Sequence, residues 1–155
     1  MVRNPGGMKV AQAYNPERRA GDLGLTRAGL AWLLEDINHK ALGAIREGRS
    51  DPALADLAKV HKKELPVLIH CAGSDSFPAA ARMWKTQFDT DCVLSHGCFD
   101  AHLTADYEVG LGVPINAGPR TLDYLSTRDG ALTGIAHAYE KAGAQNLSLN
   151  TDSSV

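Results

Sequence analysis

Short apolar runs alternate with longer amphipathic segments through most of this chain. The runs expected to be strands lie at 66–70, 92–96, 113–117 and 147–151. Runs of this length are typical of buried strands, and strands that alternate with helices of about 10–14 residues form βαβ units. The pattern therefore predicts an α/β fold in which parallel βα repeats share one sheet.

The intervening segments carry apolar residues at helical spacing. The expected helices are 26–49, 52–62, 77–88, 100–110 and 130–142, and a short strand at 8–13 precedes them. Thr26 and Asp51 are placed to cap the first two helices. We interpret 14–25 and the stretch from Arg120 through Tyr124 to Arg128 as exposed loops.

Two of these helices have an inner row that can be named from spacing alone. Phe77, Ala81, Trp84 and Phe88 are spaced for burial in the third helix. Leu103 and Tyr107 form the expected inner row of the fourth helix.

Three of the expected strands end in a residue that can bind a metal. His70 closes the strand at 66–70, His96 closes the strand at 92–96, and Asp152 follows the last strand. Each alone has an ordinary interpretation, because a histidine at a strand end is usually structural and an aspartate there usually caps a turn. Together they favour a metal site, because function is built at the carboxyl ends of parallel strands. Imidazole and carboxylate are ligands that Zn²⁺, Fe²⁺ and Mn²⁺ accept.

Other candidate residues are assigned structural or solvated roles. His39, His61, His102 and His137 fall on predicted helices or their ends. Cys71 and Cys98 follow the candidate ligands closely, but a cysteine is also a common small buried residue.

Composition narrows the class of protein. The 155 residues are enough for one domain with a sizeable core, which we assign to 1–155. A net charge of −2 indicates no nucleic-acid partner, and no apolar run is long enough to cross a membrane. Three cysteines without a C-x-x-C pair suggest a reducing compartment, so a cytoplasmic location is expected.

The motifs around these strand ends resemble one known family. They comprise 65–70 (LPVLIH), 93–97 (VLSHG), 112–119 (GVPINAGP), 149–153 (LNTDS), and 7–11 (GMKVA) with the following Asn15-Pro16. In this form and order they resemble strands four to eight of the metal-dependent amidohydrolase superfamily, and most closely its imidazolonepropionase-like branch. The resemblance covers nearly the whole chain.

The resemblance implies a TIM-type (β/α)8 barrel hydrolase that acts on C–N bonds of amides or cyclic amides through a metal-activated water. His70 and His96 would ligate or flank a divalent metal. Zinc is the metal we expect, with iron or manganese as alternatives. Asp152 would bind the metal and act as general base on the attacking water. The substrate would be a small molecule, and the residues that bind it are unknown.

The chain also departs from the family pattern. The family's His-x-His pair on strand one has no counterpart here, Ala72 stands where a second histidine often follows strand five, and Tyr14 replaces an acidic residue before Asn-Pro. We therefore expect part of a barrel, the carboxyl-terminal portion of a longer hydrolase with reduced or no activity alone. An open sheet would pair its edges with another subunit or a second copy.

The alternative is a non-catalytic α/β binding or assembly module in which the histidines are structural. A complete doubly wound nucleotide-binding domain is disfavoured, because no glycine-rich phosphate loop follows any predicted strand.

Overall fold

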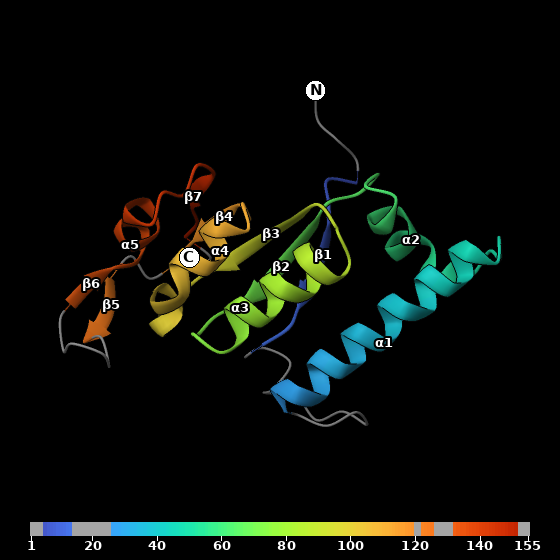
Figure 1. Cartoon of the computed structure of the whole chain (residues 1–155), viewed down its shortest axis with the longest axis horizontal. Coiled ribbons are helices and arrows are strands. Elements are labelled where there is room, and N and C mark those ends of the chain that lie inside the picture. The colour runs from blue at the N-terminus through green and yellow to red at the C-terminus, as the bar shows by residue number, and fades with distance from the viewer. Residues whose placement is uncertain (1–4, 14–25, 120–121, 126–131, 152–155) are drawn as a thin grey trace.

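The protein is described by a computed structural model over residues 5–13, 26–119, 122–125 and 132–151. These residues form a five-stranded sheet and a separate two-stranded ribbon (Figure 1). The larger sheet has the order β1 (Met8–Ala11), β2 (Val67–Cys71), β3 (Cys92–His96), β4 (Ile115–Ala117) and β7 (Leu147–Leu149). Every neighbouring pair in it is parallel. The prediction of parallel βα repeats is confirmed.

Helices join successive strands. They are α1 (Arg27–Arg46), the 3₁₀ turn η2 (Pro52–Leu54), α2 (Ala55–His61), α3 (Ser76–Ala81) with the π-helical η3 (Arg82–Gln87), the 3₁₀ segment η4 (Phe99–Thr104), α4 (Ala105–Gly110) and α5 (Ile135–Lys141). Both predicted caps are confirmed: the Thr26 hydroxyl accepts from the Gly29 amide at 3.0 Å, and Asp51 accepts from the Ala53 amide at 3.0 Å.

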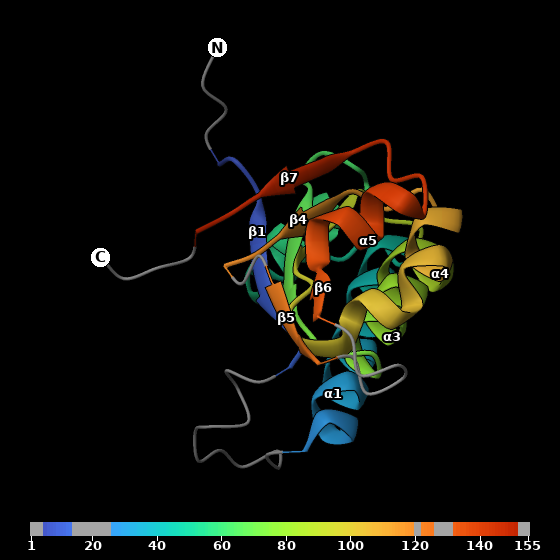
Figure 2. The same cartoon turned by 90° about the vertical axis from the view of Figure 1, so that its left-hand side faces the viewer.

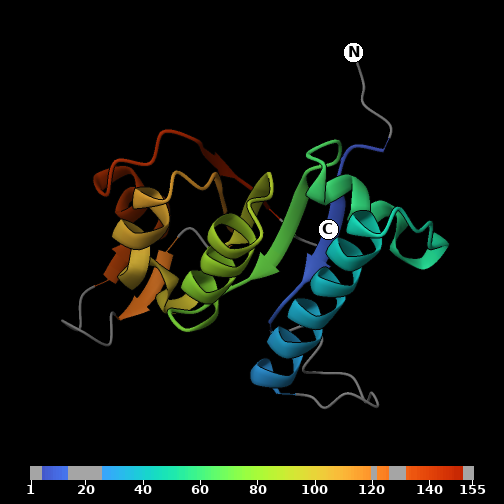
Figure 3. The same cartoon turned by 45° about the vertical axis from the view of Figure 1, so that its right-hand side comes forward.

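The two faces of the sheet differ in character. Side chains alternate between faces along a strand, so residues paired in register share a face. Val67, Ile69, Cys92, Leu94 and Ile115 share the face that is buried. Figure 2 shows the helices gathered on one side of the sheet, and Figure 3 shows α1 (cyan) beside the β1 end and α5 near the β7 end. The apolar face is therefore the one that the helices cover.

The opposite face is more polar and less covered. Lys9, Leu68 and Val93 share it, and Lys9 is exposed. Asn116 and Ser148 continue it, joined by a hydrogen bond of 3.1 Å from the Ser148 hydroxyl to Asn116 Oδ1. In a (β/α)8 barrel the face away from the helices lines the barrel interior.

The helix after β2 carries Trp84, the largest fully buried side chain among the described residues. Phe77, Ala81, Trp84 and Phe88 are all buried, as their spacing predicts. Trp84 is also held by a polar contact, because its indole Nε1–H donates to Oε1 of the buried Gln12 at 3.0 Å. This contact joins η3 to the residue that follows β1, where the strand carboxyl ends meet.

One predicted inner row is wrong. Tyr107 is 42% exposed, whereas its neighbour Glu108 is fully buried. The cause is the 3₁₀ segment η4, which advances about 3.0 residues per turn instead of 3.6 and so rotates the following helix. Ala101, Ala105 and Glu108 form the inner row in place of Leu103 and Tyr107.

The segment before α5 also differs from its prediction. β5 (Leu122–Leu125) and β6 (Leu132–Gly134) form an antiparallel ribbon where we expected a loop and the start of a helix at residue 130. The helix begins only at Ile135. Arg120, Arg128 and the predicted loop 14–25 lie outside the described residues.

Within the described part of the chain, no helix is both long and apolar enough to span a bilayer.

Candidate metal centre

The two strand-end histidines lie side by side. His70 in β2 and His96 at the end of β3 have ring centroids 4.3 Å apart, with the ring planes at 75° in an edge-to-face arrangement. Both side chains are buried, with residue exposures of 9% for His70 and 6% for His96. The fold therefore brings together the two imidazoles that the sequence singles out.

Strand alternation alone would not produce this contact. In the sheet register His70 is paired with Ser95, while His96 is paired with Cys71, so regular alternation assigns the histidines to opposite faces. His96, however, has a φ of +95°, a left-handed conformation that non-glycine residues seldom adopt. This departure at the strand end accompanies the ring contact, and strained backbone of this kind clusters at functional sites.

A backbone carbonyl sets the tautomer of His96. Its Nδ1 lies 3.0 Å from the carbonyl oxygen of Gly118, just after β4. A carbonyl only accepts hydrogen bonds, so Nδ1 carries the proton and a neutral ring keeps its lone pair on Nε2. Hydrogen bonding of one ring nitrogen to a carbonyl is how metal-binding histidines are usually oriented.

The carboxyl end of β4 lies next to His96, and the carboxyl end of β7 lies next to that of β4. The Gly118 amide donates to the His96 carbonyl at 2.9 Å, and the Asn150 amide donates to the Ala117 carbonyl at 2.8 Å. Asn150 Nδ2 also donates to the Asn116 carbonyl at 3.0 Å. Asp152, the third predicted donor, lies outside the described residues.

The described residues contain two metal donors rather than a full set. No group of three or more His, Cys, Asp or Glu side chains that could hold a metal ion occurs within 5–13, 26–119 and 132–151. Two neighbouring imidazoles, one with a lone pair directed by its hydrogen bond, fit a divalent cation such as zinc as part of its ligand set. A complete set requires at least one further donor.

The nearby cysteines do not add to this set. Cys71 and Cys98 are buried free thiols. Burial raises the pKa of the Cys71 thiol well above its ordinary value, which favours the protonated form over the thiolate that metals bind. Cys98 Sγ donates to the Gly118 carbonyl at 3.2 Å. These contacts support the structural interpretation of both residues.

The remaining histidines make contacts of other kinds. His39 and His137 are exposed and approach Glu35 and Glu140 at 3.9 and 3.5 Å. The buried His102 places Nδ1 3.2 Å from the Phe99 carbonyl, and His61 packs edge-on against Phe88 with ring centroids 5.8 Å apart.

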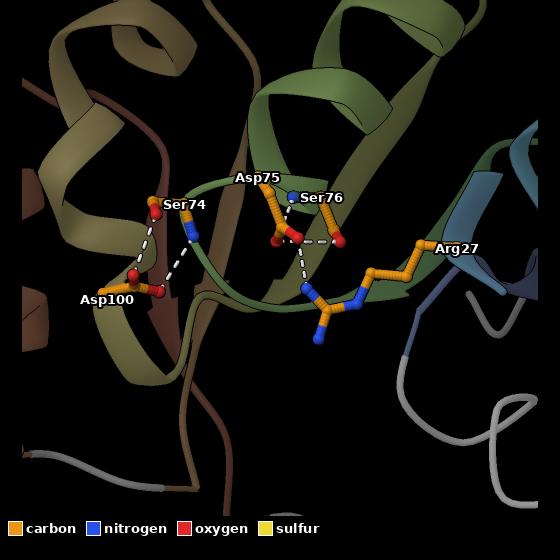
Figure 4. Close-up of polar contacts among 5 residues, drawn as sticks. All are labelled: Arg27, Ser74, Asp75, Ser76 and Asp100. Atoms are coloured by element: carbon orange, nitrogen blue, oxygen red, sulfur yellow. Dashed lines mark hydrogen bonds and ion pairs between the residues drawn. The ribbon is translucent and has the colours of Figure 1, made fainter.

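A polar rim lies along the loops that follow β2 and β3, and sequence spacing did not reveal it. The loop after β2 meets the loop after β3: the Gly73 amide donates to the Cys98 carbonyl at 3.1 Å, and Ser74 donates twice to Asp100. Next to Ser74, Asp75 pairs with Arg27 at the start of α1 (Figure 4). These residues are ordinary loop polar residues in the sequence, so only their tertiary contacts identify them.

A buried carboxyl on the helix side of the sheet was also missed. Glu108 Oε1 accepts from the Thr104 hydroxyl at 2.9 Å, and Oε2 is buried without a hydrogen-bond partner in the described structure. Burial raises the pKa of Glu108 to about 7. Tyr139 of α5 is fully buried, and its pKa is raised by burial and then by the proximity of Glu108.

Comparisons with known proteins support the fold. No protein-family model matches the sequence, and no curated protein matches it. Among solved structures, the chain is similar to the crystal structure of an amidohydrolase from Thermotoga maritima MSB8, with a TM-score of 0.80 and 24% sequence identity. The alignment covers 100% of this chain and 44% of that chain. The protein thus has an α/β fold that corresponds to part of a TIM-type barrel.

Proposed function

We propose that this chain carries part of the catalytic centre of a metal-dependent hydrolase of the amidohydrolase superfamily. It would act on C–N bonds in amides or cyclic amides of small molecules. The observation that carries this proposal is the His70–His96 pair, whose rings meet at the carboxyl ends of two neighbouring parallel strands. The fold shared with the Thermotoga maritima amidohydrolase supports it.

The metal would be held by His70, by His96 through Nε2, and by Asp152 as a third donor. When bound, a zinc ion, or iron or manganese in its place, supplies Lewis acidity toward a carbonyl and lowers the pKa of a bound water. Asp152 would accept the proton from that water as general base. Asn150, two residues before Asp152, supports this assignment. Its amide donates a hydrogen bond to the carbonyl of Ala117, the residue before Gly118, whose carbonyl accepts from His96.

The chain's own groups would keep the histidines ready for binding. The Gly118 carbonyl accepts the hydrogen bond from Nδ1–H of His96, so the lone pair of Nε2 remains available to bind a metal. Burial of both rings restricts their motion and limits access of bulk water. The motifs at 112–119 and 149–153 favour the imidazolonepropionase-like branch, and we propose a cyclic amide as the substrate class on that basis.

Metal analysis of purified variants tests this proposal. We expect His70→Ala and His96→Ala each to weaken zinc binding at least about 10-fold, because each removes a ligand. Asp152→Ala should weaken binding and also abolish any hydrolysis of cyclic amides. His137→Ala is the matched control, because that imidazole is 75% exposed and lies on α5. If the His70, His96 and His137 variants bind zinc equally well, the proposal is wrong.

A non-catalytic assembly module is the second candidate. It is favoured by the small donor set, since the described residues contain no group of three or more potential ligands. On this view His70 and His96 stabilise the strand ends by packing. Equal metal binding in all variants, together with a lower melting temperature for His70→Ala and His96→Ala but not for His137→Ala, would favour it over the hydrolase.

A further inference from the structure

We infer that Asp100 is a positioning residue that ties the loop after β2 to the loop after β3 and so holds the two imidazoles in contact. This inference rests on the proposed function, because it assigns a purpose to the geometry of the same site. It concerns a carboxylate that would not bind the metal itself.

The contacts of Asp100 span the two histidine-bearing units. Asp100 Oδ1 accepts from the Ser74 amide at 2.9 Å, and Oδ2 accepts from the Ser74 hydroxyl at 2.8 Å. Ser74 lies four residues after His70, and Asp100 lies four residues after His96. Figure 4 shows both oxygens of the carboxylate directed at Ser74. The bidentate contact therefore fixes the distance and the orientation between the two loops.

A second contact makes this connection continuous. The Gly73 amide donates to the Cys98 carbonyl at 3.1 Å. The two loops are therefore joined at two adjacent places, Gly73 to Cys98 and Ser74 to Asp100. Cys98 in turn donates through Sγ to the Gly118 carbonyl, the same oxygen that accepts from His96 Nδ1. A shift of the loop after β3 would thus be transmitted to the hydrogen bond that orients His96.

The backbone at this point needs such support. His96, Gly97 and Phe99 all have positive φ angles of +95°, +58° and +60°. Two non-glycine residues in left-handed conformations persist only where surrounding contacts hold them. Asp100 is the residue directly after this strained turn, and its hydrogen bonds to Ser74 fix the end of the turn against the loop after β2. Loss of the carboxylate would release the turn and let His96 move from His70.

The neighbouring carboxylate has a different task. Asp75 pairs with Arg27 and accepts from the Ser76 amide at 2.7 Å, so it joins the β2 loop to α1 and caps α3. In the described part of the chain its side-chain contacts go to Arg27 and Ser76, and not to the loop that carries His96. Of the two carboxylates drawn in Figure 4, Asp100 is therefore the one that connects the loop after β2 to the loop after β3.

The test compares Asp100→Ala with Asp106→Ala in the full chain. Asp100→Ala removes both acceptors for Ser74. Asp106 is exposed on α4, so its variant loses the same charge without touching the loops. The primary measurement needs no metal: ring-to-ring nuclear Overhauser contacts between His70 and His96 by NMR. We expect these contacts in the unmodified protein and in Asp106→Ala, and their loss or strong weakening in Asp100→Ala.

Cobalt titration supplies the second measurement, with visible absorption as the signal. We expect Asp100→Ala to weaken Co²⁺ binding about 10-fold, in the range seen when an outer-shell partner of a metal ligand is removed. Ser74→Ala, which keeps the backbone donor, should have a smaller effect in the same direction. It also serves as the milder variant if Asp100→Ala does not fold.

The outcomes separate this inference from the proposed function. If Asp100→Ala keeps the ring-to-ring contacts, the inference is overturned, whatever the metal affinity. If His70→Ala binds Co²⁺ as well as the unmodified protein, the proposed function fails, while loss of the ring contacts in Asp100→Ala would still support the positioning role. A metal affinity reduced equally by Asp100→Ala and Asp106→Ala would indicate a charge effect and count against Asp100.

Discussion

Single residues at the strand ends determine whether the candidate site can form. Gly118 shows this most clearly, because its φ of +128° is accessible mainly to glycine and a Cβ there would lie 2.1 Å from the Asn150 carbonyl oxygen. Its own carbonyl orients His96. The backbone at one residue therefore links β4, β7 and the imidazole pair.

Replacing Gly118 should be severely destabilising. We expect Gly118→Ala to lower the free energy of unfolding by more than about 2 kcal/mol, since strain and a backbone clash add together. Gly43→Ala is the control, because nothing lies within 4 Å of the Cβ position at this residue in the last turn of α1. That variant should gain up to about 1 kcal/mol from helix propensity. Urea denaturation measures both; similar values for the two variants would contradict the assigned role of Gly118.

The residues of the histidine pair were predictable, but their contact was not. His70 and His96 follow apolar runs, and this pattern is visible in the sequence. Their edge-to-face packing depends on the positive φ of His96 and on the Gly118 carbonyl, which lies 22 residues further along the chain. No local pattern encodes a contact at that separation. Asp152 stays a prediction, because it lies outside the described residues.

At the scale of elements, the contact between α4 and α5 carries an unusual buried acid. Glu108 faces inward because η4 changes the helical register before α4. Tyr139 of α5 is close enough for Glu108 to raise its pKa. Hydrophobic periodicity placed Tyr107 there instead, because periodicity assumes 3.6 residues per turn throughout.

Glu108 should make stability depend on pH. Its pKa is raised from 4.5 to about 7 by burial, so the folded protein binds an additional proton between these values. The stabilising contribution is present below about pH 4.5 and is lost as pH rises through about 7, at a cost of up to about 3 kcal/mol. Glu108→Gln should remove this dependence.

Urea denaturation of the Glu108 variant between pH 5 and 8 checks this, with the difference from the unmodified protein as the measured quantity. Glu140→Gln on α5 is a suitable control, because that side chain is 77% exposed. A difference between Glu108→Gln and the unmodified protein that does not change with pH would show that Glu108 titrates normally.

At the scale of the molecule, the sheet has two free edges in the described structure. β1 and β7 stand at the ends of the strand order, and each pairs with one neighbour. Leu149 in the β7 edge is 65% exposed. Unpaired strand edges with exposed apolar residues favour pairing with another chain. We propose that the isolated chain associates through these edges.

Sedimentation velocity over a range of concentrations tests this association. We expect Leu149→Lys to shift the protein toward monomer, because a lysine at an edge strand opposes pairing. Leu132→Lys is the control, since Leu132 is equally exposed at 65% but lies in the β5–β6 ribbon. An unmodified chain that is monomeric throughout, or equal effects of both substitutions, would contradict association through β7.

The alternation of strands and helices was determined by the sequence itself, because burial of apolar side chains imposes periods of 2 and 3.6 residues on the chain. For the same reason the inner row of α3 and η3 and the strand-end positions of His70 and His96 were correctly predicted. The two helix caps were predictable because Thr and Asp side chains accept hydrogen bonds from the free amides of a first turn. Each of these features depends on residues that are close together in the chain.

Tertiary structure alone decided what those positions become. The contact of the two imidazoles and the hydrogen bonds between Ser74 and Asp100 join residues from different βα units. The burial of Glu108 depends on a local change of helix type. Such features arise from backbone conformations and long-range hydrogen bonds, which leave no periodic signal. The sequence therefore identified the two histidines of the candidate site, and the packing of neighbouring strands set their geometry.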